Sequence, residues 1–142
     1  MFLVFIFMTY LADASLDPSL VKIPVLYEDR FVKVTTESLI LKWYFFPSCG
    51  KKTIPFGDIE AFLREPISVL ASKGWGMGFS NVWYACDLVR QFQSKQNHFL
   101  SVKIAGSKIR KGFSVENFAK FEAALAEVQS RDGTMLTVSN RE

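Results

Sequence analysis

The segment that follows Phe113 restricts the fold most, because its pattern predicts one well-delimited amphipathic helix. Ser114 is a suitable N-cap, since a serine hydroxyl can accept a hydrogen bond from an unpaired first-turn N–H. Phe113 and Phe118 have the spacing of a hydrophobic staple, and Glu116 would lie in the first turn, where the helix dipole favours a carboxylate. Apolar residues then recur at helical spacing on one face: Phe118, Phe121, Leu125 and Val128. Asp132-Gly133 predicts the end of the helix.

Short segments rich in β-branched and aromatic residues precede this helix. They span residues 21–25, 31–36, 39–46, 53–56, 59–64, 82–92, 99–104 and 108–113. Turn signals separate them, most clearly Pro47-Ser48-Cys49-Gly50 and the Ala105-Gly106-Ser107 centre of a predicted hairpin. The segment 82–92 is ambiguous between strand and helix, and its Tyr, Trp, Cys and Val residues favour a strand. The sequence therefore predicts a mainly β protein with one C-terminal helix.

Length and composition indicate one folded domain. The chain has 142 residues, of which 49% are hydrophobic and 22% charged, a balance typical of globular rather than disordered proteins. Cys49 and Cys86 are too few for a disulfide-rich scaffold and lack zinc-site spacing. We expect two free thiols, although one bridge is possible if the chain is secreted.

The first residues form an apolar extension. Residues 1–11 are nearly all apolar, and Ala12-Asp13-Ala14 resembles a signal-peptidase site, but the initial Lys or Arg of a signal peptide is missing. The stretch is too short to span a bilayer as a helix. A cleaved signal at residues 1–14, an extra element and an anchor remain open. We expect an extension at residues 1–20, a domain at 21–133, a tail at 134–142 and a cytoplasmic location if no signal is removed.

The pattern of strands and helix resembles the pleckstrin-homology-like superfamily, in its bacterial-type branch, over residues 24–130. The segments that carry the resemblance are Leu39–Trp43 leading into Pro47–Gly50, then Lys52–Ile59, then Ile109–Ser114 running into the helix. The resemblance implies a bent antiparallel sheet or partly open barrel of about seven strands, capped by the helix. It also implies a non-catalytic binding or scaffolding module.

The first hairpin departs from the pattern of classical lipid-binding members, which carry closely spaced basic residues there. Here the turn is Thr35–Ser38, and Lys33 and Lys42 flank an acidic residue, Glu37. Inositol-phosphate recognition is therefore not expected at that hairpin.

No catalytic or metal-binding arrangement is evident in the sequence. His98 is the only histidine, and we expect it in a loop rather than as a general base, because no nucleophile or orienting carboxylate accompanies it. Gly74–Gly78 resembles half of a nucleotide loop but lacks the Lys-Ser/Thr that would bind phosphate. We expect no enzyme activity, no metal and no cofactor.

Two tryptophans and two charged residues define an alternative site. Asp87 and Arg90 would be neighbours on a helix and would point to opposite faces of a strand. We favour a structural ion pair, since buried charges are usually paired for structural reasons. The alternative function is a small ligand-binding protein or enzyme with a pocket near residues 66–81, lined by Trp75, Trp83, Asp87 and Arg90.

The basic residues are concentrated in the middle of the chain. Residues 51–113 carry ten basic and four acidic side chains, a net charge of +6 in a chain of net +3. Alternation in the 99–113 hairpin turns Leu100, Val102, Ile104, Ile109 and Phe113 inward. It turns Lys103, Lys108 and Arg110 outward, with the direction of Lys111 open.

These cations have two interpretations. One is a solubilising edge that prevents strand addition. The other is a docking face for an acidic protein or anionic lipid headgroups, reinforced by Lys51 and Lys52 if their turn lies nearby. Nucleic acid is not expected, because the charge is modest and basic residues are not interleaved with exposed aromatic residues.

Overall fold

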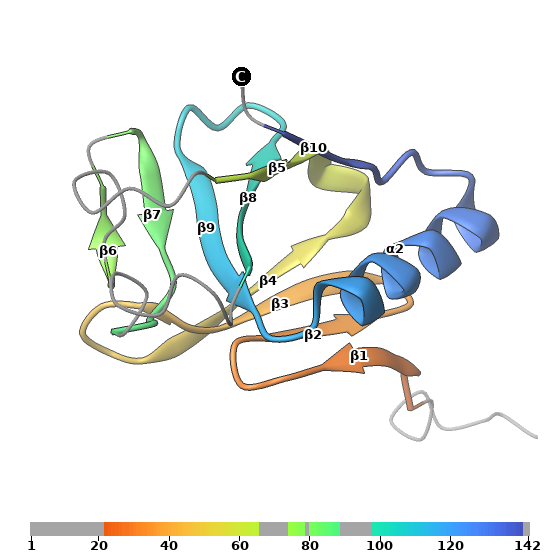
Figure 1. The fold of residues 1–142 in the computed structure, drawn as a ribbon, viewed down its shortest axis with the longest axis horizontal. Coiled ribbons are helices and arrows are strands. Elements are labelled where there is room, and N and C mark those ends of the chain that lie inside the picture. Colours follow the sequence, from red (N-terminus) through yellow and green to blue (C-terminus); the bar gives the residue numbers. More distant parts are fainter. Residues whose placement is uncertain (1–21, 66–73, 79, 89–97, 141–142) are drawn as a thin grey trace, which may run out of the picture.

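The structure, a computed structural model, describes residues 22–65, 74–78, 80–88 and 98–140. Its strands are β1 (Val25–Glu28), β2 (Val32–Thr35), β3 (Ser38–Phe45), β4 (Gly50–Pro55), β5 (Ile59–Arg64), β6 (Gly76–Met77), β7 (Val82–Tyr84), β8 (His98–Ile104), β9 (Arg110–Val115) and β10 (Val138–Asn140). A short 3-10 turn, η2 (Phe56–Asp58), joins β4 to β5, and helix α2 (Phe118–Asp132) precedes β10. The expected mainly β fold with one helix near the C-terminus is confirmed for this part of the chain (Figure 1).

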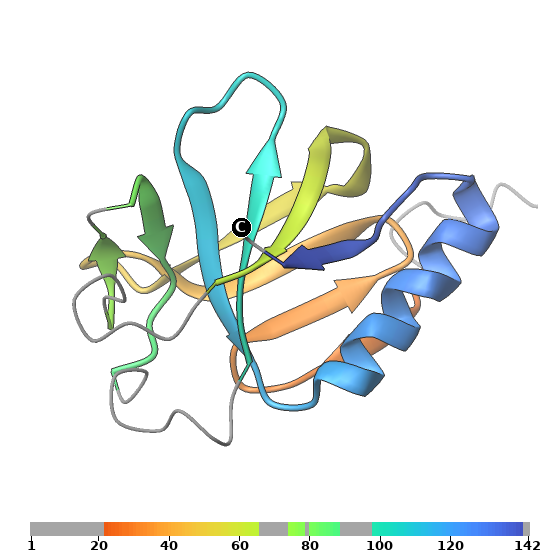
Figure 2. The ribbon, with the colours of Figure 1, turned by 45° about the horizontal axis from the view of Figure 1, so that its top comes forward.

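The strands form two bent sheets rather than a closed barrel (Figures 1 and 2). Sheet A has the order β1-β2-β3-β4 and is antiparallel throughout. Sheet B has the order β10-β5-β8-β9-β7-β6, and its β10–β5 and β7–β9 pairs are parallel. The expectation of about seven antiparallel strands is therefore corrected to ten strands in the described residues, two pairs of them parallel.

The hairpin before the helix forms as predicted. β8 and β9 pair antiparallel with Leu100 opposite Phe113 and Val102 opposite Lys111. Leu100, Val102 and Phe113 are fully buried, as the alternation required. The prediction that Ile109 points inward is wrong, because this residue lies in the turn before β9 begins and is exposed.

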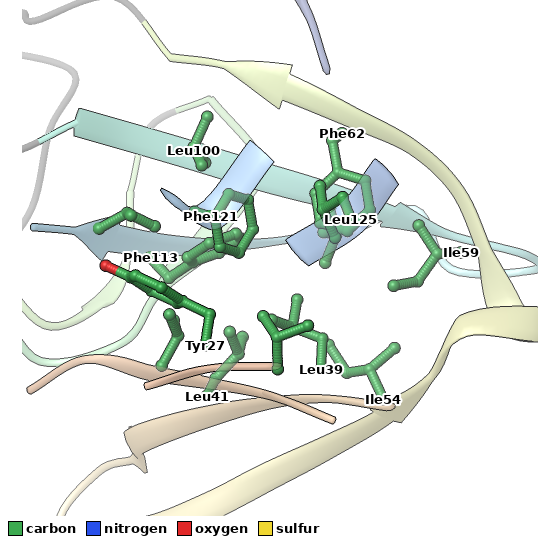
Figure 3. Packing of buried hydrophobic residues seen from close by; sticks show 14 of the residues in the cluster. Tyr27, Leu39, Leu41, Ile54, Ile59, Phe62, Leu100, Phe113, Phe121 and Leu125 are labelled. Carbon is green, nitrogen blue, oxygen red and sulfur yellow. The ribbon is translucent and has the colours of Figure 1, made fainter. Parts of the chain in front are cut away.

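Helix α2 closes the core with the predicted apolar face. Phe121, Ala124, Leu125 and Val128 are buried, and Phe118 packs against the core while partly exposed. The ring of Phe121 contacts Tyr27, Phe62 and Phe113, with centroids 5.9, 6.0 and 5.9 Å away (Figure 3). Because these partners come from β1, β5 and β9, one helical side chain joins both sheets.

The helix begins three residues later than the sequence indicated. Asn117 is the N-cap, and its side-chain oxygen accepts a hydrogen bond from the Lys120 N–H at 3.0 Å. Ser114 belongs to β9, and its hydroxyl donates to the buried Asp87 carboxylate at 2.7 Å. The predicted staple and the first-turn role of Glu116 are therefore wrong. The helix end is as predicted: Gly133 adopts φ 67° and its N–H donates to the Gln129 carbonyl.

The chain after the helix returns to the sheet. Val138–Asn140 form β10, which runs parallel to β5 with Val138 opposite Phe62, and Leu136 is buried. The expected tail at 134–142 therefore contributes a strand of the domain.

The predicted extension and cleavage site at residues 1–20 lie outside the described residues. The predicted strand at 82–92 is shortened to β7, since residues 85–88 are not a strand and residues 89–92 are not described.

Candidate functional site

The six cations singled out in the sequence do not form one exposed face. Lys103 is exposed and pairs with Glu60, with 3.1 Å between Nζ and Oε2. Lys108 is exposed in the β8–β9 turn. Lys51 and Lys52 lie in β4 rather than in a turn. Figure 1 shows the β8–β9 turn, which carries Lys108, away from the β3–β4 turn.

Arg110 is a structural residue rather than a docking residue. Its side chain is 14% exposed, and its Nη1 lies 2.8 Å from the carboxylate of Glu65, which is 2% exposed. The Ser101 hydroxyl donates to the same carboxylate. The outward prediction for Arg110 was correct about the face of the strand and wrong about solvent, because the guanidinium is held by the buried Glu65 carboxylate and donates to the Ser80 carbonyl.

Lys111 points toward the space between the sheets. It lies opposite the buried Val102, and its ammonium donates to Ser107 Oγ at 2.8 Å and to the Ile109 carbonyl. Burial, followed by the nearby positive charge of Lys52, lowers the pKa of Lys111. Lys52 and Lys111 thus share one region of positive potential.

The described residues of the alternative pocket make hydrogen bonds that connect separate parts of the chain. The indole N–H groups of Trp75 and Trp83 both donate to the Tyr44 carbonyl, at 3.2 and 3.0 Å. Asp87 is buried against the Ser114 hydroxyl. Arg90 and most of the 66–81 segment lie outside the described residues, so the predicted Asp87–Arg90 pair stays a prediction.

A bulge in β3 sets the direction of its aromatic residues. Leu41 pairs with Lys52 and Phe45 with Gly50, so residues 42–44 face Lys51 alone. Trp43 takes a left-handed backbone conformation, with φ 53°, which is uncommon for a bulky residue. The Trp43 carbonyl accepts a hydrogen bond from the Cys86 N–H at 2.9 Å. The bulge therefore exposes the Trp43 side chain and buries that of Tyr44.

Three aromatic side chains stand in solvent at the end of this hairpin. Trp43 is 53% exposed, Phe45 44% and Phe46 61%. Lys51 and Lys52 accompany them on β4, and the Lys52 ammonium lies 5.7 Å from the centroid of the Phe45 ring. We call these five residues, Trp43, Phe45, Phe46, Lys51 and Lys52, the hairpin tip. The rings of Phe46 and Trp75 make a T-shaped contact with centroids 4.9 Å apart, so the residue before β6 contacts the tip.

The hairpin tip is positively charged and lies at one end of the molecule. Between Glu37 and Asp58 the chain has no acidic residue and carries Lys42, Lys51 and Lys52. Lys42 is neutralised by Glu28, 2.8 Å away, which leaves the two tip lysines. In both ribbon views the β3–β4 turn lies at the end remote from α2 (Figures 1 and 2).

The aromatic part of this surface was not predicted from the sequence. Residues 39–46 were expected to form a strand, and basic residues were not expected to be interleaved with exposed aromatic ones. A usable signal was present, because Trp43-Tyr44-Phe45-Phe46 are consecutive and successive side chains of a strand point to opposite faces. Some of these rings therefore had to face solvent or another element.

The remaining chemistry-bearing residues form no further site in the described part of the chain. No group of three or more His, Cys, Asp or Glu residues in it could hold a metal ion. Cys49 is exposed and Cys86 half-buried, and the two do not form the disulfide bridge that the sequence left open. His98 is the first residue of β8 rather than a loop residue. None of the helices among the described residues is long and apolar enough to cross a membrane.

Comparison with protein-family models, curated proteins and solved structures finds no match for this chain.

Proposed function

We propose that this chain is a non-catalytic binding module that docks on a negatively charged partner through the hairpin tip. The observation that carries the proposal is the exposure of Trp43, Phe45 and Phe46 beside Lys51 and Lys52. Isolated exposed apolar residues are common on protein surfaces, whereas a contiguous group rimmed by polar residues marks an interaction site.

The composition of the hairpin tip suits binding. Tryptophan and other aromatic residues are enriched in the energetically dominant centres of interfaces, because they bury a large area with few rotatable bonds. The adjacent lysines supply long-range attraction to a negative partner, and this attraction raises the association rate. The bulge holds Trp43 outward with backbone strain, which is a feature concentrated at functional positions.

The pleckstrin-homology-like assignment is part of this proposal. It is supported by a bent antiparallel sheet A, and by a hairpin that leads into a helix packed on the core. β10 and the parallel β7–β9 pair are additions to the pattern that the resemblance implies. The pocket alternative has less support, because the indole N–H groups of Trp75 and Trp83 are already occupied by the Tyr44 carbonyl.

Site-specific photocrosslinking tests whether the hairpin tip is the contact surface. Benzoylphenylalanine replaces Phe46 in one version of the chain and the exposed Glu122 of α2 in a control version, in cells that produce the protein naturally. We expect adducts, of whatever class, from position 46 and few from position 122. We also expect Lys51→Glu/Lys52→Glu to reduce the yield from position 46. Equal yields from the two positions, or none from position 46, would contradict the proposal.

A further inference from the structure

We infer that the partner of the hairpin tip is the surface of an anionic lipid bilayer, into whose interface Trp43, Phe45 and Phe46 insert. This inference rests on the proposed function and adds the identity of the partner. The lysines of the tip would remain at the level of the lipid phosphates and carboxylates.

The shape of the site favours a fluid partner. The rings stand on and beside the β3–β4 turn, which lies with β6 and β7 at the end of the molecule remote from α2 (Figures 1 and 2). A group of exposed rings needs a matching surface in a protein partner, whereas lipid headgroups rearrange around it. Tryptophan suits the interfacial zone, because its apolar ring and polar N–H favour a region that is apolar on one side and wet on the other.

The arrangement of lysines favours a surface with distributed negative charge. Lys51 is exposed, and Lys52 lies over the Tyr44 and Phe45 rings, so both ammonium groups flank the apolar part of the tip. Long lysine stems can follow apolar surface while the charged ends stay in water. Each basic residue near an anionic bilayer strengthens binding by about fivefold.

The charges at the two ends of the molecule differ. The exposed side of α2, remote from the β3–β4 turn, carries Glu122, Glu127 and Asp132 against Lys120 and Arg131, and Glu127 pairs with Arg131 (Figure 1). A negative surface would therefore attract the tip, with its two lysines, more strongly than the nearly neutral face of the helix. Interfacial insertion combined with this attraction needs no preformed headgroup pocket.

Vesicle co-sedimentation with matched variants tests the inference. The probes are phosphatidylcholine vesicles with and without phosphatidylserine, at low and high salt. Trp43→Asn/Phe46→Ser removes the rings, and asparagine is chosen because it tolerates the left-handed conformation of residue 43. Lys51→Glu/Lys52→Glu reverses the charge. Lys108→Glu/Lys120→Glu makes the same charge change elsewhere, and Met135→Ser removes an exposed apolar side chain elsewhere.

We expect the parent to bind vesicles that contain phosphatidylserine, and to bind less at high salt because exposed charges are screened. Each tip pair should weaken binding at least about tenfold, which corresponds to the loss of two favourable contacts near the bilayer. Neither control should change it by more than about twofold. All variants are compared at equal helix content and equal denaturation midpoint, so that a folding defect is not mistaken for lost binding.

Insertion has a spectroscopic signature that simple charge attraction lacks. Brominated lipids should quench tryptophan fluorescence in the parent, and quench it much less in Trp43→Phe, since Trp75 and Trp83 donate inward to the Tyr44 carbonyl. Binding without quenching would overturn insertion.

Three outcomes would overturn the lipid partner. One is a folded parent protein that does not bind anionic vesicles. Crosslinking of position 46 to a protein would then support the proposed function with a protein as the partner. The second is an equal loss in Lys108→Glu/Lys120→Glu, which would assign binding to net charge. The third is tighter binding to single-stranded oligodeoxythymidine or to polyglutamate than to vesicles, each measured by fluorescence anisotropy.

Discussion

Gly112 occupies a place in β9 where no side chain fits. A Cβ at this position would lie 2.5 Å from Tyr84 Cδ1 and 2.7 Å from Val82 Cγ1, both on the neighbouring β7. Gly112→Ala would therefore force the buried Tyr84 ring to move. We expect it to lower the free energy of unfolding in urea by about 1–3 kcal/mol.

Gly57→Ala is the matched control, because a Cβ there meets nothing within 4 Å. It should change stability by less than about 0.5 kcal/mol. If the two substitutions have equal effects, the β7–β9 pairing described above is wrong.

Arg110 and Glu65 provide a second prediction at the residue scale. Arg110→Met removes the cation and leaves a buried carboxylate, which still holds the Ser101 hydroxyl. We expect a loss of about 3 kcal/mol, because removing the Arg110 cation weakens the compensation of a buried charge.

The double variant Glu65→Gln/Arg110→Met should recover part of this loss, since it also removes the buried charge. Lys108→Met, at an exposed cation in the adjacent turn, should have almost no effect. Chemical denaturation of the parent and the three variants measures these differences. An Arg110→Met variant as stable as Lys108→Met would show that the Arg110 side chain is exposed rather than part of a buried ion pair.

At the scale of elements, two indoles connect β3 to the β6–β7 pair through one carbonyl. The buried Tyr44 carbonyl keeps a donor when either Trp75 or Trp83 is replaced and loses both when neither is present. Trp75→Phe and Trp83→Phe should each cost about 1 kcal/mol. The double variant should cost more than their sum, because only then is a buried acceptor left unpaired. A double-mutant cycle from urea unfolding measures this coupling, and an additive result would show that the two bonds are independent.

Local sequence signals predicted some elements well. The α2 stripe through Phe121, Leu125 and Val128 and its glycine stop required only helical periodicity and one left-handed residue. The start of the helix was displaced because Ser114, a good cap by local rules, bonds instead to Asp87 from another part of the chain. A local pattern cannot reveal such a contact.

The hairpin tip was hidden for a related reason. Its lysines were recognised from charge, and its aromatic residues were assigned to a regular strand. Exposure of Trp43 accompanies a bulge in β3, and the carbonyls of Trp43 and Tyr44 in this bulge accept hydrogen bonds from residues 75, 83 and 86, which lie in or beside β6 and β7. The consecutive aromatic residues were a sign of irregularity, but they did not identify which residue would take the positive φ.

At the scale of the whole molecule, the unpredicted features are the pairings between distant segments. Parallel β7–β9 pairing places Val82 beside Arg110, and parallel β10–β5 pairing brings the end of the described chain into sheet B. Parallel strands need long connections, so no turn signal announces them. The fold class followed from local periodicity, whereas the order of strands in sheet B did not.

Strand β10 covers part of a sheet edge through which two copies of this chain could otherwise pair. Without it, the outer edge of β5 would offer six residues of unpaired backbone, flanked by the apolar Phe62 and Leu63 side chains. Such an edge is a template for strand addition between molecules, whereas a three-residue edge that ends in Ser139 and Asn140 is a poor one. We expect a chain shortened after Gly133 to self-associate with rising concentration in sedimentation experiments, while the full chain does not. Restoring residues 134–142 with Ser139→Pro, which cannot donate a backbone hydrogen bond, should restore solubility only in part. We therefore expect β10, which follows α2 in the chain, to protect the protein against aggregation by covering an edge of sheet B.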